Sequence, residues 1–252
     1  MQNLKKNLIT IITVVKNSAS TIEKCIKSVL DQDYDKIEYI IIDGKSNDGT
    51  KEILEKYKNK ISKIVIGEDD GIWDAMNKGI EIANGNIVGF LNADDFYNPG
   101  ALSTVNKYFV NSNIDFLFGS VKKYKLMYGY SPWKIKWSFG FYSSHSAGFF
   151  IKLDKHKEVG KYNKNFLSSD LDFFYKMIVN LKFKGTSTKK NEILGVFGKG
   201  GFSSKINYID HLKDLNQIRI NNNQNKFFVR FLYLIKIIKK PLKFLRAFSK
   251  KN

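Results

Sequence analysis

The chain has 252 residues, 43% of them hydrophobic, which suits one large folded domain and excludes a disordered chain. Its one cysteine, Cys25, excludes an internal disulfide and fits a reducing compartment. The formal net charge of +18 predicts an anionic partner such as nucleic acid, anionic lipid or a phosphate-bearing substrate.

The first half of the chain alternates between apolar runs of strand length and amphipathic runs of helix length. The apolar run at the N-terminus has no small-residue cleavage site after it, so we interpret it as a strand and not as a signal peptide. Strands are predicted at residues 8–15, 37–43, 61–67 and 86–93. Helices are predicted at residues 18–32, 47–57, 71–85 and 99–110. This alternation predicts an α/β fold with a mostly parallel, buried sheet.

The second half is less regular. It contains a strand that runs into a loop (114–125), an aromatic stretch of strands or loops (131–153), a helix capped by Ser168 or Ser169 (168–183), and a strand followed by a glycine-rich loop (191–204). We expect the folded domain to comprise residues 1–205 and a basic helical tail to comprise residues 206–252.

The tail carries a concentrated positive charge. No acidic residue follows Asp214, whereas lysines and arginines continue to the end. Apolar residues recur at helical spacing, namely Phe228, Phe231, Leu232, Ile235 and Ile238. The pattern predicts an amphipathic helix on an anionic membrane surface; a helix packed on the domain with a solvated basic face is the alternative. No stretch approaches the roughly 20 apolar residues needed to span a bilayer.

Acidic residues end two of the predicted strands. Asp43 closes the second strand, and Asp94 and Asp95 close the fourth, so all three are expected along one edge of the sheet. Two adjacent carboxylates oppose each other's ionisation unless a cation meets them. Carboxylates are suited to Mg²⁺ or Mn²⁺ bound together with substrate phosphates. From this pair alone, an exposed turn is an equally good interpretation.

Four motifs in order resemble the inverting family-2 glycosyltransferases of the GT-A fold. The resemblance covers roughly residues 8–205 and is strongest from Ile11 to Tyr97. The motifs are ITIITVVKNSASTIEKCIKSVLDQDY, IEYIIIDGKSNDGT, EDDGIWDAMNKGIEIANGNIVGFLNADDFY and SSDLDFFYKM. The resemblance implies a Rossmann-like, mostly parallel sheet with flanking helices.

The resemblance also implies roles for individual residues. Asp94 and Asp95 would hold Mg²⁺ or Mn²⁺, and Asp170, in the first turn of its predicted helix, would be the catalytic base. The implied contacts to the donor nucleotide are Asp43, Asp70, Asn77, Lys78 and Asp94. Weaker acceptor or sugar contacts are His145 and Asp172, of which the latter can instead cap the helix or brace its partner.

Each role has a structural alternative, and the motifs depart from the family twice. Asp43 can cap a turn, Asn77 and Lys78 can lie on a solvated helix face, and His145 can pack among aromatic residues. The family often has a second acid where this chain has Gly44, and an aspartate where it has Asn92. The nucleoside contact is therefore in question, and the metal site depends on Asp94 and Asp95.

The implied activity is metal-dependent transfer of a sugar, with inversion, from a nucleotide-diphosphate sugar. The acceptor would be a saccharide, free or linked to polyprenyl diphosphate, in the synthesis of surface polysaccharide such as the O-antigen of lipopolysaccharide. The enzyme would work in the cytoplasm, on the inner face of the membrane. A sugar-nucleotide nucleotidyltransferase is an alternative, but the loop KNSAST after the first strand lacks the glycines of that class. A nucleic-acid-binding module would fit the charge, although the carboxylates at the sheet edge would repel phosphates.

Overall fold

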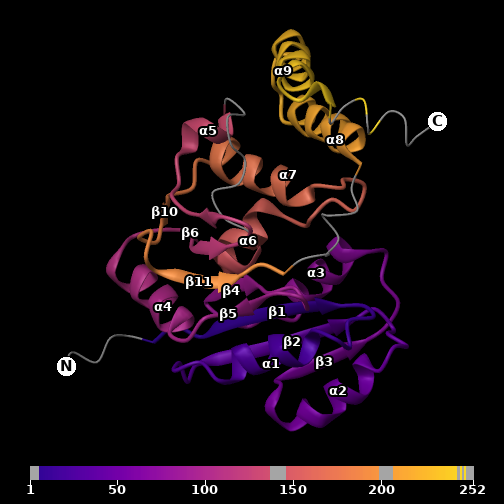
Figure 1. Ribbon diagram of the computed structural model, residues 1–252. Coiled ribbons are helices and arrows are strands. Elements are labelled where there is room, and N and C mark those ends of the chain that lie inside the picture. Colours follow the sequence, from indigo (N-terminus) through magenta and orange to yellow (C-terminus); the bar gives the residue numbers. More distant parts are fainter. Residues whose placement is uncertain (1–5, 137–145, 199–206, 243–244, 246, 248–252) are drawn as a thin grey trace. The chain divides into compact units, whose positions relative to one another are not determined.

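The computed structural model describes residues 6–136, 146–198, 207–242, 245 and 247 (Figure 1). The chain forms two compact units. Unit 1 comprises Met1–Ser131, Tyr142–Lys161 and Phe183–Lys199, and unit 2 comprises Pro132–Phe141, Tyr162–Lys182 and Gly200–Asn252. The division expected after residue 205 stays a prediction.

Unit 1 is built on a sheet with the strand order β10-β6-β9-β4-β1-β2-β3. The strands are β1 (Ile9–Val15), β2 (Ile37–Asp43), β3 (Lys63–Ile66), β4 (Ile87–Phe90), β6 (Phe116–Phe118), β9 (Phe149–Lys152) and β10 (Gly185–Ser187). Among these strands only β9 runs against its neighbours, so the prediction of a mostly parallel sheet is confirmed.

Helices flank this sheet as the alternation predicted (Figure 1). They are α1 (Ile22–Leu30), α2 (Thr50–Tyr57), the 3-10 turn η1 (Lys58–Lys60), α3 (Ile72–Glu81), α4 (Ala101–Asn111), the 3-10 turn η2 (Ser146–Gly148) and α6 (Leu153–Val159). Helix α3 packs on β1 and β2. A Cβ at Gly79 of α3 would lie 2.5 Å from Cγ2 of Ile12, so glycine permits this close contact.

A second, smaller sheet was not predicted as such. It has the order β5-β11-β7-β8, formed by β5 (Phe96–Tyr97), β7 (Ser120–Lys122), β8 (Leu126–Met127) and β11 (Ile193–Val196). Strand β5 begins directly after Asp95 and pairs with β11. The small sheet therefore continues the chain from the end of β4.

Unit 2 is helical in its described part. It contains α5 (Pro132–Lys136), α7 (Ser169–Tyr175), the π-helical turn η3 (Lys176–Asn180), α8 (Tyr208–Asn221) and α9 (Lys226–Lys239). The helix predicted at 168–183 is confirmed over α7 and η3, and the predicted helical tail forms α8 and α9. No helix in the described ranges has the length and apolar character needed to cross a membrane.

Candidate active site

The site forms where three parallel strands end. Val15 at the end of β1 pairs with Asp43 at the end of β2, and β4 runs parallel on the other side of β1. The chain then leaves β4 through a turn in which the Asp95 N–H donates to the Asn92 carbonyl at 2.9 Å. The buried Cys25 thiol donates to the same carbonyl at 3.5 Å. The predicted common edge of Asp43, Asp94 and Asp95 is therefore confirmed.

Asp95 is almost completely buried, with 1% of its surface exposed. Its Oδ1 accepts a hydrogen bond from the Gly198 N–H at 2.9 Å, and its Oδ2 accepts one from the Ser146 hydroxyl at 3.4 Å. Burial, together with the negative charge of Asp94, raises the pKa of Asp95 to about 8. The ionised carboxylate is thus unfavourable at this position unless a cation approaches it.

Asp94 and Asn92 present oxygen atoms that the described protein does not use. Asp94 Oδ2 and Asn92 Oδ1 are buried and have no hydrogen-bond partner among the described residues. Burial also raises the pKa of Asp94. The described residues contain no cluster of three or more acidic, histidine or cysteine side chains that could hold a metal. Two carboxylates and an amide oxygen fit a divalent cation that also binds substrate phosphates.

One cation near this pair was missed from the sequence. Burial raises the pKa of Asp94, and the positive charge of Lys123 partly opposes this rise; burial also lowers the pKa of Lys123 itself. Its ammonium lies 4.1 Å from the centre of the Phe197 ring, an arrangement favourable for a cation. Lys123 lies just after β7, far from Asp94 in the sequence, so no sequence pattern indicated the electrostatic interaction between the two residues.

Gly198 was singled out only as part of a glycine-rich loop. A Cβ at this position would collide with the carbonyl oxygen of Asp94. Glycine therefore lets the backbone after β11 approach closely enough for its N–H to reach Asp95. The rest of that loop, including Gly200 to Ser203, lies outside the described residues.

Asp43 is fully buried. Its Oδ1 accepts hydrogen bonds from the N–H of Ser46 at 3.1 Å and from its hydroxyl at 2.5 Å. These contacts are those of a residue that stabilises a turn, the structural alternative for Asp43. A role in nucleoside binding stays a prediction.

An acid from another part of the chain, Asp69, lies next to Gly44, where the family often has its second acid. A Cβ at Gly44 would collide with Oδ2 of Asp69, so the Asp69 carboxylate lies directly against this backbone. Asp69 Oδ1 accepts a hydrogen bond from the Gly71 N–H at 3.1 Å, which fixes the side chain before α3. Sequence reasoning chose Asp70 at this loop and passed over Asp69.

The other residues expected to contact the donor nucleotide lie on this loop and on α3, and Asp70 and Lys78 form contacts with nearby residues of the chain. Asp70 is exposed, and its N–H donates to Asp74 at 3.1 Å. Lys78 forms an ion pair with Asp74 at 2.9 Å and donates to the Glu68 carbonyl at 2.6 Å. Asn77 is 7% exposed. Their contacts to a donor stay predictions.

In unit 2 the two aspartates of α7 have different surroundings. Asp172 is buried; its Oδ1 accepts from Asn222 at 2.7 Å, and its Oδ2 pairs with Lys176 at 2.7 Å. Asp170 is half-buried, and its Oδ1 accepts from the N–H of Leu171 at 3.0 Å. Asp172 thus connects α7 to Asn222 at the end of α8, and a contact of Asp172 to sugar or acceptor stays a prediction. His145 lies outside the described residues.

The raised pKa of Asp95 gives a pH-dependent prediction. The pKa of Asp95 is about 8 in the folded protein and 3.8 ordinarily. Protonated Asp95 therefore contributes stability that is fully present below pH 3.8 and is lost as the pH rises through about 8. We expect Asp95→Asn to raise the melting temperature in EDTA at about pH 8.5 and to change it little at about pH 4. Glu52→Gln on α2 is the exposed control. An equal effect of Asp95→Asn at both pH values would contradict the assignment.

The chain is similar to known proteins both in sequence and in fold. The chain is 34% identical over 116 residues to the putative teichuronic acid biosynthesis glycosyltransferase TuaG of Bacillus subtilis, covering 45% of this chain and 46% of TuaG. It is 31% identical over 120 residues to a poly(ribitol-phosphate) beta-glucosyltransferase of Bacillus spizizenii, covering 45% of this chain and 19% of that protein. The chain thus spans less than half the length of these curated relatives.

Two solved structures share the fold at 17% sequence identity. TarS 1–349 of S. aureus in complex with UDP-GlcNAc gives a TM-score of 0.71 over 88% of this chain and 69% of that chain. The mannosyltransferase PcManGT of Pyrobaculum calidifontis, in complex with GDP-Man and Mn2+, gives 0.70 over 97% and 74%. The expected GT-A fold is therefore confirmed. The family model of glycosyl transferase family 2 matches residues 10–169, more than half of the 252 residues, and the chain belongs to this family.

Proposed function

We propose that the protein transfers a sugar from a nucleotide-diphosphate sugar to a saccharide acceptor, with inversion at the anomeric carbon. The adjacent acids Asp94, which is half-buried, and Asp95, which is buried, carry this proposal. Burial raises the pKa of both, and Asp94 Oδ2 has no partner among the described residues, so their ionised forms are unfavourable without a cation.

The donor would bind at the carboxyl edge of unit 1. Asp94 and Asp95 would hold Mg²⁺ or Mn²⁺, with Asn92 Oδ1 available as a further ligand. The bound metal would neutralise charge on the diphosphate leaving group. Asp43 and Asp69 are the carboxylates proposed for the nucleoside side.

The solved structures that share the fold support a nucleotide-sugar donor, since TarS was solved with UDP-GlcNAc and PcManGT with GDP-Man. The names of the curated relatives support a role in bacterial surface polymers. We therefore propose a saccharide acceptor, free or carried on polyprenyl diphosphate.

The proposed base is Asp170. In a single displacement the acceptor oxygen attacks the anomeric carbon while the bond from that carbon to the diphosphate oxygen breaks. The acceptor hydroxyl must lose its proton in this step, and a positioned carboxylate can accept it. Asp94 and Asp95 would be engaged on the leaving-group side, and Asp172 already has both oxygens engaged.

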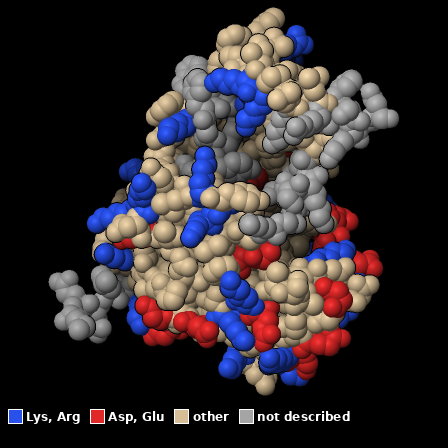
Figure 2. Space-filling model, in the orientation of Figure 1, with Lys and Arg blue, Asp and Glu red and all other residues tan. Residues whose placement is uncertain are grey.

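We also propose that α9 contacts an anionic membrane surface. Its buried residues are Val229 and Leu232, whereas Phe227, Phe231, Leu234 and Ile238 are exposed by 80%, 58%, 57% and 75%. This exposed stripe differs from the expected one, which placed Leu232 on the outer face. In Figure 2 the described atoms of α9 are blue or tan and none is red, consistent with the lack of acids after Asp214. Exposed apolar residues among cations fit an interfacial helix.

The first test is a panel of nucleotide sugars. With Mn²⁺ present, we expect one nucleotide class to raise the melting temperature and its sugar donor to be slowly hydrolysed. EDTA should abolish both effects, and so should Asp94→Asn, because a metal ligand is lost in each case. Stabilisation by single-stranded nucleic acid alone, or full hydrolysis in EDTA, would refute the proposal.

The second test separates the two aspartates of α7. We expect Asp170→Asn to keep nucleotide-dependent stabilisation and to lose transfer by roughly 10²-fold or more, the scale of general-base removal. Asp172→Asn should instead lower the melting temperature, because it breaks the buried contact to Lys176. If Asp170→Asn transfers sugar at the wild-type rate, Asp170 is not the base.

The third test concerns the membrane. The triple variant Phe231→Ser, Leu234→Ser, Ile238→Ser should lose binding to vesicles of anionic phospholipid in a co-sedimentation assay, because it removes most of the exposed apolar surface of α9. Ile66→Ser, at a residue 51% exposed in unit 1, is the matched control and should bind as the wild type does. Equal binding of the triple variant and the control would contradict the proposal.

A further inference from the structure

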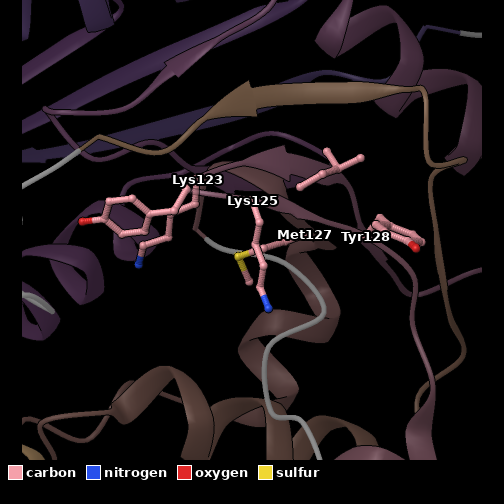
Figure 3. Close-up of a pocket in the computed structure, with 6 residues that line it drawn as sticks. Lys123, Lys125, Met127 and Tyr128 are labelled. Atoms are coloured by element: carbon pink, nitrogen blue, oxygen red, sulfur yellow. The ribbon is translucent and has the colours of Figure 1, made fainter.

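The hairpin of β7 and β8 carries a pocket on unit 1 that none of the roles above uses. Six consecutive residues, 123–128, line it (Figure 3). The lining combines the lysines Lys123 and Lys125 with two tyrosines and the apolar Leu126 and Met127. Apolar and aromatic side chains with a few polar groups are the usual lining of a small-molecule site.

The aromatic rings of this pocket are open to solvent. Tyr124 is 76% exposed and Tyr128 is 52% exposed, although large aromatic side chains stabilise a fold mainly when they are buried. The ammonium of Lys190 lies 4.9 Å from the centre of the Tyr128 ring. Exposed rings of this kind can pack against the C–H face of a sugar.

The charged residues of the hairpin that lines the pocket are all basic. Lys122, Lys123 and Lys125 lie in the hairpin, and no acidic residue occurs from Ser120 to Pro132. The adjacent loop adds Lys189 and Lys190, and its Glu192 already accepts hydrogen bonds from Tyr108 at 2.6 Å and from the Lys189 N–H at 2.9 Å. The pocket therefore favours a ligand with a negative charge.

The pocket adjoins the acidic pair within the same unit. Lys123 lines the pocket and also lies close enough to Asp94 and Asp95 for their charges to raise its pKa against the effect of burial. In addition, β7 pairs with β11, and the chain after β11 supplies the Gly198 N–H that binds Asp95. A ligand in the pocket would thus be held next to the proposed donor site.

We infer that this pocket binds the saccharide acceptor and that the acceptor carries a negative charge, as a phosphate or a carboxylate. The inference depends on the proposed function, because it assigns the second substrate of the same reaction. Tyr124 and Tyr128 contact sugar rings, while Lys125 and Lys190 bind the anion. A single-stranded nucleic acid would need a groove for several nucleotides, whereas one short hairpin lines this pocket.

The test measures binding of three small probes to the full chain by saturation-transfer NMR. The probes are glucose, glucuronic acid and glucose 6-phosphate, all in EDTA so that no metal can bind the phosphate. We expect at least one anionic probe to bind about fivefold more tightly than glucose, and Lys125→Gln to remove this difference. Tyr128→Ala should weaken all three. Lys51→Gln, an exposed lysine on α2, is the matched control and should change none.

The two anionic probes distinguish the source of the charge. Tighter binding of glucose 6-phosphate alone assigns a phosphate-bearing acceptor, and tighter binding of glucuronic acid alone assigns a uronic acid. No detectable saccharide binding, no preference for an anion, or a preference that survives Lys125→Gln would overturn the inference. Binding of oligodeoxythymidine that is lost in Lys125→Gln, without saccharide binding, would also overturn it. Donor binding in the nucleotide-sugar panel is measured separately, so its failure would refute the proposed function instead.

Discussion

The placement of two adjacent carboxylates after β4, the half-buried Asp94 and the buried Asp95, is the constraint on which the rest of the site depends. Asp95 is held by the Gly198 N–H and the Ser146 hydroxyl, two neutral donors that hydrogen-bond to the carboxylate without cancelling its charge. Lys123 supplies one positive charge, and burial lowers the pKa of its ammonium group. With both acids ionised the balance is negative, so a divalent cation would be attracted by the acids and a diphosphate by that cation.

The same constraint explains the architecture around the pair. Three parallel strands bring Asp43 and the turn after β4 to one edge through backbone pairing. The small sheet then brings the chain back from two distant places. Strand β11 delivers Gly198, and strand β7 delivers Lys123, so residues from far apart in the sequence meet the acids.

The large sheet and the aspartates at its edge could be predicted from the sequence. The β-branched runs at the core strands and the aspartates at their ends follow local rules, and both predictions are confirmed. The small sheet could not be predicted, because strands of two to four residues such as β5 and β7 have too few positions for a periodic pattern. Asp69 and Lys123 were missed because their surroundings come from tertiary contacts. Asp170 and Asp172 look alike in the sequence, and the contacts of Asp172 to Lys176 and to Asn222, which lies far along the chain, distinguish them in the structure.

The single cysteine has a use that follows from its position. Its thiol is fully buried, its pKa is raised to about 12 by burial, and it touches the Asn92 carbonyl in the turn that carries the acids. A thiol-specific reagent can therefore reach it only when this part of unit 1 opens. The rate of labelling reports how often the packing around Cys25 opens, so the natural chain contains a probe of local opening beside its acidic site, without any engineered label.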